Sequence, residues 1–405
     1  MVIHLGERMK YVIVVGDGMA DYPLEELGGK TPLQVANKPN MDWIASNGRS
    51  GVLRTIPAGM NPGSDVAIMS ILGYNPREHH RGRGPLEAAG MGVKLEKKDL
   101  AFRCNLITQK NGVIVDYSAD HITTEEAREL INTIKKEFRY LGDFYTGISY
   151  RHLFVLKKFY DDPDKIKTVP PHEVMGKKIN DCLAGPMDNK TAKILNEMML
   201  SSRKILSSHQ INLARIKNRK NPANMIWVWG EGKKPTMKTL VEKYSVKGAV
   251  VSAVTVVKGV GVCAGMTKLE VPGATGYYDT NYENKAKYAL DALKTHDLVL
   301  VHVEAPDEAG HVGDIERKIE AIENIDSRLV GNIIDGLRGE YKMAIMADHP
   351  TPIKIRAHAA DPVPFSIYST KDQKDEVKCF DEKSAENGSL GLLEGYNFMD
   401  IFVWF

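Results

Sequence analysis

The stretch "YVIVVGDGMAD", residues 11–21, decides the fold. Its first five residues are apolar and mostly β-branched, and a glycine-rich loop with two aspartates follows at once. Such a run is typical of a parallel strand that is buried on both faces. Similar runs recur at residues 225–229, 248–254, 297–303 and 342–348, and helical patterns alternate with them. This alternation predicts an α/β fold with a doubly wound, mostly parallel sheet.

The middle of the chain has a different pattern. It begins with a hairpin around an Asn-Gly turn and continues with a helical pattern, a further strand and a second long helical pattern. At 405 residues the chain also exceeds the usual size of one domain. We therefore predict a core formed by residues 1–92 and 221–405, with an α+β domain inserted between them at residues 93–220. Hinges near residues 92 and 220 would let the inserted domain act as a lid.

Composition argues against several classes of protein. The net charge is only +2, from 54 basic and 52 acidic residues, which is no electrostatic footprint for nucleic acid or an anionic membrane. The four cysteines form no Cys-x-x-Cys pair, which argues against a zinc finger or a dithiol redox site. The first ten residues do not match a signal peptide, and no apolar run has the length of a transmembrane helix. We expect a soluble, cytoplasmic protein, whose oligomeric state these features do not predict.

Three aspartates and three histidines come just after predicted core strands. Each alone has an ordinary explanation as a turn residue, half of a surface pair on a helix, or a hydrogen-bonded loop histidine. Sites in doubly wound sheets lie at the carboxyl ends of strands, so we expect all six at one edge. Without a counter-charge such a group would repel itself or stay unpaired, and divalent cations resolve that conflict. Mixed Asp/His ligation suits Mn, Zn or Co better than calcium. The six residues are Asp17, Asp307, His311, Asp348, His349 and His358.

A serine lies where a helix is expected to begin, in "NPGSDVAIMS" at residues 61–70. Ser64 could cap that helix by accepting a hydrogen bond from a free backbone N–H of the first turn. Alternatively it is a nucleophile, held where those N–H groups and the helix dipole stabilise an anion. Divalent cations nearby favour the second interpretation, because a coordinated hydroxyl is acidified near neutral pH.

Several motifs together resemble the archaeal-type, cofactor-independent phosphoglycerate mutases of the alkaline phosphatase superfamily of metalloenzymes. The likeness covers nearly the whole chain in order, apart from the first ten residues and the extreme C-terminus. The motifs that carry it are "VVGDGMAD", "GGKTPLQVANKPNMD", "GMNPGSDVAIMSILGYNP", "RGRGPLEAA", "SYRHLFVL", "PANMIWVWGEG", "APDEAGHVGD" and "ADHPTP".

The resemblance implies two divalent metal ions, with Mn favoured over Zn, Co or Mg, and a serine that is transiently phosphorylated. No bisphosphoglycerate primer would be needed to interconvert 3-phosphoglycerate and 2-phosphoglycerate. By motif, one metal would be held by Asp307, His311 and His358. The other would be held by Asp17, Ser64, Asp348 and His349. The expected residue type stands at all seven positions.

The resemblance also implies basic residues that bind a small phosphorylated carboxylate, partly from the inserted domain. Arg103, Arg151, His152 and Lys258 match the family's motifs for this role. Arg151 and Lys258 would join Ser64 as catalytic residues. Each also has an ordinary explanation as a solvated or structural charge. Arg is the side chain suited to bidentate contacts with a carboxylate or a phosphate.

Two other readings stay open. Relatives on the same architecture include proposed homoserine kinases and phosphatases, and a kinase would have to hold a nucleoside triphosphate. We see no adenine-binding signature in the sequence. A non-catalytic metal-binding protein would be favoured by loss of the nucleophile or the ligands, and all of these are present.

Overall fold

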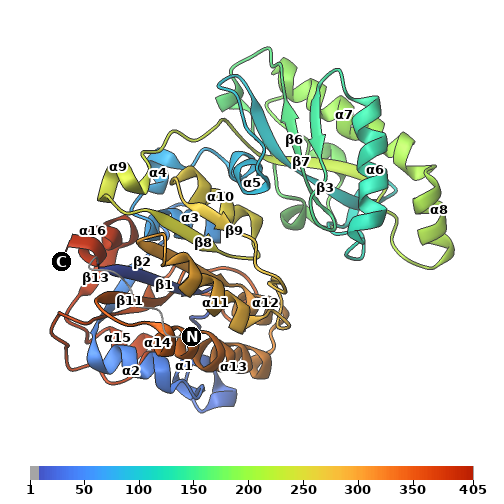
Figure 1. Ribbon diagram of the computed structural model, residues 1–405. Helices are drawn as coiled ribbons and strands as arrows, with labels where there is room; N and C mark the ends of the chain where they lie inside the picture. The colour runs from blue at the N-terminus through green and yellow to red at the C-terminus, as the bar shows by residue number, and fades with distance from the viewer. Residues whose placement is uncertain (1–8, 405) are drawn as a thin grey trace. The chain divides into compact units, whose positions relative to one another are not determined.

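The chain folds into two compact units, shown in the computed structural model that describes residues 9–404 (Figure 1). The first unit is discontinuous, and runs up to His80 and again from Thr236 onward. The second unit is the continuous segment Arg81–Pro235. Each unit has a sheet of its own.

The first unit contains an eight-stranded sheet in the order β13-β2-β12-β11-β1-β10-β8-β9. Every strand runs in the same direction except β12, which is antiparallel to both of its neighbours. The central strand β1 is buried along its whole length, as its continuous apolar run predicts. The prediction of an α/β fold with a mostly parallel sheet is confirmed. The strands are β1 (Lys10–Gly16), β2 (Arg49–Arg54), β8 (Gly248–Val251), β9 (Thr267–Leu269), β10 (Leu298–Val303), β11 (Tyr341–Ala347), β12 (Val363–Ser369) and β13 (Gly391–Glu394).

Helices cover both faces of this sheet (Figure 1). One group packs α3 against α10 and α16, and the other packs α2 and α11 against a continuous helical stretch of α13, the π-helix η5 and α14. This is the doubly wound arrangement that the alternating pattern predicts. The helices are α1 (Pro32–Val35), α2 (Pro39–Asn47), α3 (Ser64–Ile71), α4 (Pro76–His79), α9 (Leu240–Tyr244), α10 (Thr255–Cys263), α11 (Tyr282–Ala292), α12 (Ala305–Val312), α13 (Ile315–Asn324), η5 (Ile325–Val330), α14 (Gly331–Gly336), α15 (Glu382–Ala385) and α16 (Phe398–Trp404).

The second unit is built around an antiparallel sheet. Strand β3 is its centre and pairs with β4, β6 and β7, while β5 pairs with β6. Asn111 and Gly112 form the turn between β3 and β4, as their sequence predicts, and both have positive φ angles. The elements are α5 (Arg83–Met91), β3 (Leu100–Lys110), β4 (Val113–Asp116), α6 (Thr124–Glu137), β5 (Gly142–Tyr145), β6 (Arg151–Leu156), α7 (Lys190–Ser207), α8 (Gln210–Lys217) and β7 (Met225–Gly232).

The second unit is longer at both ends than the inserted segment 93–220 expected from the sequence. Helix α5 belongs to it because α5 packs on β3 and β7. Strand β7 belongs to it because it pairs antiparallel with β3, from Ala101↔Gly232 to Ile107↔Met225. The prediction that residues 225–229 join the parallel sheet is therefore wrong. A short apolar run looks the same whichever sheet buries it.

Short 3₁₀ turns complete the architecture: Glu25–Leu27, Pro163–Lys165, Pro171–Val174, Ile179–Asp181 and Gly395–Asn397. None of the helices in the described part of the chain combines the length and the apolar character that crossing a bilayer requires.

Candidate active site

Three neighbouring strand ends create the site. Gly16, the last residue of β1, is paired with Val303 at the end of β10 and with Ala347 at the end of β11. The next residues along the chain are therefore brought to one edge of the sheet, including Asp17 and Asp348. This is the carboxyl edge, where doubly wound sheets carry their sites.

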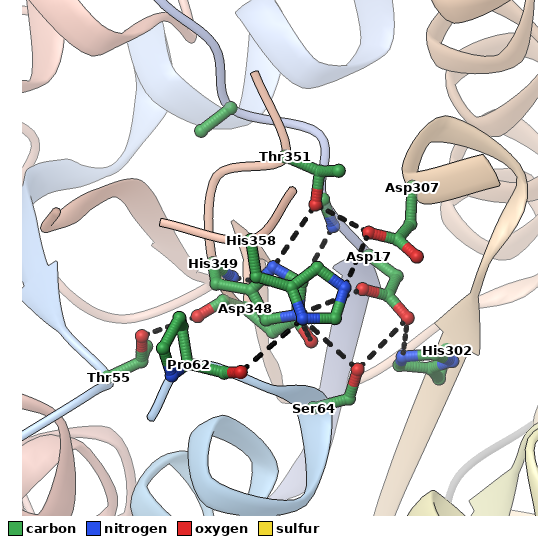
Figure 2. A network of polar contacts seen from close by, with 12 residues as sticks. Asp17, Thr55, Pro62, Ser64, His302, Asp307, Asp348, His349, Thr351 and His358 are labelled. Atoms are coloured by element: carbon green, nitrogen blue, oxygen red, sulfur yellow. Dashed lines mark hydrogen bonds and ion pairs between the residues drawn. The ribbon is translucent and has the colours of Figure 1, made fainter. Parts of the chain in front are cut away.

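Ser64 is the first residue of α3, but its side chain does not cap the helix. The N-cap is Gly63, and no side chain accepts a hydrogen bond there. Instead, Ser64 Oγ donates to Asp17 Oδ2 at 3.2 Å and lies 3.4 Å from His349 Nε2 (Figure 2). The capping interpretation of Ser64 is thus wrong, and its hydroxyl belongs to the cluster at the strand ends.

Asp307 lies between two histidines. It is on α12, and its carboxylate oxygens each lie 3.3 Å from a ring nitrogen, Nε2 of His311 and Nε2 of His358. Those two nitrogens are 3.0 Å apart. Burial opposes ionisation of Asp307, but the hydrogen bonds from both histidines outweigh it and hold the pKa of Asp307 well below its usual range. Burial likewise opposes protonation of His311, yet Asp307 raises the pKa of His311 to about 9.

Asp17 and Asp348 carry buried oxygens that nothing in the described chain satisfies. Asp17 Oδ1 and Asp348 Oδ2 accept no hydrogen bond, although both residues are almost fully buried. Burial, and then repulsion from Asp348 and Asp307, raises the pKa of Asp17 well above its usual range. Unpaired buried carboxylate oxygens are costly, so this arrangement fits a cation.

The seven predicted ligand residues lie in one connected cluster. His349 Nε2 is 3.5 Å from Asp17 Oδ1 and 3.5 Å from Asp348 Oδ2, and the Asp307 group adjoins it (Figure 2). Three sets of side chains bring one ligand atom each within 4.8 Å of one another. They are Asp307, His349 and His358; Asp17, His302 and Asp348; and Asp17, Glu304 and Asp307. Carboxylates mixed with imidazoles are the donors that first-row transition metals take, so the residues present fit such ions.

Sequence reasoning missed three residues of this cluster. His302 is fully buried in β10, with Nε2 3.1 Å from Asp17 Oδ2, and burial lowers the pKa of His302 to about 4. Glu304 directly follows β10, and Thr351 donates to Asp307 Oδ1 at 2.5 Å. A histidine within the otherwise apolar run "LVLVHV" was the available signal for His302. Glu304 and Thr351 stand beside predicted ligands in the motifs "EAPDEAGH" and "ADHPTP".

Lys258, predicted to bind substrate, lies on α10 in the first unit. Its Nζ donates to Glu270 Oε2 at 2.6 Å, and none of the contacts described above reaches it. The other three predicted substrate residues belong to the second unit.

Arg103 and His152 are buried near the middle of the antiparallel sheet. Arg103 Nη1 donates to Glu87 Oε1 at 2.9 Å, and its guanidinium lies 5.2 Å from the centre of the Trp229 ring. Burial lowers the pKa of Arg103 to about 10 and that of His152 to about 3. His152 Nδ1 accepts from the Gly147 N–H at 3.1 Å. Arg103 Nε and His152 Nε2 have no hydrogen-bond partner within the described chain, which is unusual for buried polar atoms.

Arg151 differs from these two residues because its side chain is exposed at the start of β6. Its guanidinium lies 5.4 Å from the centre of the Tyr150 ring. Arg151 and His152 are consecutive in a strand, so they point to opposite faces of the sheet.

Comparison with known proteins gives a consistent result. The family model described as 2,3-bisphosphoglycerate-independent phosphoglycerate mutase matches residues 45–212. The mutase of that name from Methanosarcina barkeri is 51% identical over 403 residues, which cover 98% of this chain and 99% of the relative. A second one, from Methanothermobacter thermautotrophicus, is 50% identical over 397 residues, 98% of this chain and 97% of the relative.

Two solved structures resemble the fold over nearly its whole length. One is a protein from Pyrococcus horikoshii, with a TM-score of 0.83 and 35% identity, covering 98% of this chain and 96% of the other. The second is the cofactor-independent phosphoglycerate mutase from Thermoplasma acidophilum, with a TM-score of 0.64 and 31% identity, covering 98% and 99%.

Proposed function

The chain belongs to the 2,3-bisphosphoglycerate-independent phosphoglycerate mutases, isomerases of glycolysis, and from this premise we propose that Ser64 carries the phosphoryl group between the two hydroxyls of glycerate. The observation that supports this role is the direction of its side chain. Ser64 Oγ contacts Asp17 Oδ2 and His349 Nε2, and takes no part in capping α3.

We further propose that two divalent cations bind here, with Mn favoured over Zn, Co and Mg. Asp307, His311 and His358 would hold one cation. Asp17, Ser64, Asp348 and His349 would hold the other. The unsatisfied oxygens of Asp17 and Asp348 support this assignment. When bound, such cations would neutralise the clustered carboxylates, acidify the serine hydroxyl and offset negative charge on the phosphoryl group.

The transfer has two halves that mirror each other. Ser64 Oγ attacks phosphorus, an Oγ–P bond forms, and the P–O bond to glycerate breaks. The serine proton leaves toward Asp17 Oδ2, which already accepts the hydrogen bond of the hydroxyl, and a proton must reach the glycerate oxygen as it departs. Glycerate then reorients, and its other hydroxyl takes the phosphoryl group from Ser64. Water must be excluded meanwhile, because attack by water would convert the mutase into a phosphatase.

Arg103, Arg151, His152 and Lys258 remain our proposed substrate residues, with Arg151 and Lys258 also assisting catalysis. The substrate carries a carboxylate and a phosphate, so it needs several cationic or donor groups. The Nε of Arg103, which has no partner within the described chain, supports this role, since a bound anion would satisfy it. Arg103 shares its face of the sheet with Arg151, whereas His152 points to the other face. Arg103→Lys should raise KM at least about tenfold, because lysine cannot reproduce the planar fork of arginine.

The decisive experiment traps the phosphorylated serine. The full-length protein is mixed with radiolabelled 3-phosphoglycerate, Mn²⁺ and no bisphosphate, quenched in acid and mapped by mass spectrometry. We expect label on Ser64 and label in 2-phosphoglycerate, and neither in Ser64→Ala or after chelation. The matched control is Ser70→Ala, because Ser70 is a buried serine of the same helix whose Oγ has no hydrogen-bond partner among residues 9–404. Full turnover by Ser64→Ala would refute the proposal.

The same assay separates the alternative activities. Release of inorganic phosphate as the main product would indicate a phosphatase. Phosphorylation of homoserine by ATP, without isomerisation of phosphoglycerate, would indicate a kinase.

A further inference from the structure

We propose that Thr351 is a positioning residue that fixes the ring proton of His349 on Nδ1 and so directs the unprotonated Nε2 toward the cation site. The inference rests on the metal ligands proposed above. The side chain of Thr351 is not one of those ligands. Its proposed effect is limited to the position of the ring proton of His349.

The hydroxyl of Thr351 joins the two proposed ligand sets. It is fully buried, donates to Asp307 Oδ1 at 2.5 Å and lies 3.3 Å from His349 Nδ1 (Figure 2). Asp307 belongs to one set and His349 to the other. The Thr351 side chain therefore contacts one proposed ligand from each of the two sets.

Counting donors gives the direction of each hydrogen bond. A threonine hydroxyl has one proton, and an ionised carboxylate can only accept, so the Thr351 proton goes to Asp307. The hydroxyl oxygen then offers a lone pair to His349 Nδ1. A buried, neutral imidazole carries one ring proton, and only a proton on Nδ1 completes this contact. The opposite tautomer would set two lone pairs against each other at 3.3 Å.

The other ring nitrogen of His349 faces acceptors. Its neighbours are Ser64 Oγ at 3.4 Å, Asp17 Oδ1 at 3.5 Å and Asp348 Oδ2 at 3.5 Å. Within the described residues neither of these carboxylate oxygens receives a hydrogen bond, and Ser64 Oγ is the one neighbour to which a proton on Nε2 could be donated. Both bare oxygens would stay unsatisfied in that tautomer. A lone pair on Nε2 pointing toward the same space as these oxygens suits a divalent cation.

The surrounding packing holds Thr351 in this orientation. Its carbonyl accepts from Lys318 Nζ at 2.9 Å, and the same ammonium pairs with Asp21 at 2.7 Å, where both side chains are fully buried. Gly18 adopts a positive φ of +61°, and a Cβ there would lie 2.6 Å from Thr351 Oγ1. A Cβ on Gly310 would lie 2.3 Å from the Thr351 carbonyl oxygen. Two glycines and a buried ion pair thus leave the hydroxyl little freedom to turn away.

The first test reads the tautomer directly. Nitrogen NMR of full-length protein labelled in histidine, stripped of cations, distinguishes a proton on Nδ1 from one on Nε2, and His349→Gln assigns the signal. We expect Nδ1–H in wild type and in Thr351→Ser, which keeps the hydroxyl. Thr351→Val, which removes only the hydroxyl from a similar shape, should shift the proton to Nε2 or to a mixture.

The second test measures cation affinity without substrate. Titration with Mn²⁺ should show binding about 10- to 100-fold weaker in Thr351→Val, the usual effect of losing the partner of a ligating histidine. Thr351→Ser and Thr108→Val should bind as wild type does. Thr108 is the matched control, because its hydroxyl is buried and has no hydrogen-bond partner in the described chain.

The outcomes separate the inference from the proposed reaction. A Thr351→Val protein that keeps both Nδ1–H and wild-type Mn²⁺ affinity overturns it. If that variant does not fold, the NMR spectrum of the wild-type protein still tests the inference. A proton on Nε2 of His349 in the cation-free wild type would also overturn the role of Thr351. Neither readout involves phosphate. Failure to label Ser64 would therefore refute the phosphoserine and leave the role of Thr351 standing.

Discussion

Ser64 Oγ donates a hydrogen bond to Asp17 Oδ2 across 3.2 Å, although 47 positions separate the two residues in the chain. A serine at the start of a helix ordinarily satisfies a backbone N–H of that helix. Here the backbone N–H groups at the start of α3 donate to no side chain at the cap within the described residues. A substitution of Ser64 can therefore remove its contact with Asp17 without removing a cap from helix α3.

Ser64→Ala should abolish mutase activity and leave stability nearly unchanged. We expect turnover to fall at least about a thousandfold, as loss of a nucleophile does. The free energy of unfolding should change by less than about 0.5 kcal/mol, because no cap is lost. Thr123→Ala is the comparison, since Thr123 forms a capping box on α6 and its loss should cost about 1 kcal/mol. Urea unfolding and a coupled assay measure both quantities, and a large loss of stability in Ser64→Ala would restore the capping interpretation.

Asp17→Asn should affect the cation-free and the cation-loaded protein in opposite directions. The raised pKa of Asp17 means that its ionised form destabilises the fold, so stability falls as the pH rises above the unfolded-state value. At pH 8 without cations, the neutral variant should melt at a higher temperature than wild type. With Mn²⁺ at 100 times its dissociation constant, wild type should gain about 2.7 kcal/mol and the variant much less.

Thermal unfolding with and without chelator measures this reversal. Glu386→Gln, which neutralises an exposed acid, should leave both melting temperatures unchanged. Equal stabilisation of wild type and Asp17→Asn by Mn²⁺ would remove Asp17 from the cation site.

His152 should make the second unit sensitive to acid. Burial lowers the pKa of His152 to about 3 from an ordinary value of 6.5, so below pH 6.5 the unfolded chain takes up a proton that the folded chain refuses. Its contribution to stability is complete above pH 6.5 and is lost progressively as the pH falls toward 3. Between pH 7 and pH 5 the loss should be on the order of 1–2 kcal/mol.

His152→Asn tests this pH dependence, because an asparagine oxygen near the Nδ1 position can still accept from the Gly147 N–H. Urea unfolding followed by tryptophan fluorescence reports on the same unit, because Trp227 and Trp229 are buried there, whereas Trp43 and Trp404 of the first unit are exposed. The variant should show a flatter dependence of unfolding free energy on pH. Parallel curves for the two proteins would contradict the assignment.

Lys318→Met should destabilise the first unit strongly. Lys318 and Asp21 form an ion pair at 2.7 Å with no exposure of either side chain, and removing one partner leaves the other charge buried. The expected cost is about 3–5 kcal/mol. Lys318→Met combined with Asp21→Asn should recover part of it. A double variant as unstable as the single one would show that the lysine's bonds to Ala20 and Thr351 carbonyls matter more than the pair.

The sequence was sufficient to predict that these side chains gather at one edge of the sheet, because β-strand ends and residue types are local signals. Apolar runs of strand length marked β1, β10 and β11, and an acid directly follows each of them, although Glu304 after β10 was not predicted. The rule that such ends gather at one edge then placed Asp17 near Asp348 without any knowledge of register. Seven of the cluster's residues were predicted in this way and by resemblance.

Other features depend on contacts that no local pattern encodes. A serine at a helix start has the same local signature whether it caps or points away, so only the position of Asp17 decided between them. Strand β7 has the apolar composition of a core strand, and its partner β3 alone assigns it to the second unit. Thr351 has no chemical signature of its own, because its role comes from the distances to Asp307 and His349.

The strand order also constrains how the protein is made. Tyr11 in β1 pairs with Leu298 in β10. During synthesis on the ribosome, β1 therefore has no partner strand until some 287 further residues have been added. At about 5–20 residues per second the delay is roughly 15–60 s. The continuous segment Arg81–Pro235 can complete its own sheet within that interval. Until β10 and β11 are synthesised, both edges of this apolar strand stay unpaired, so the nascent first unit is exposed to pairing with other chains.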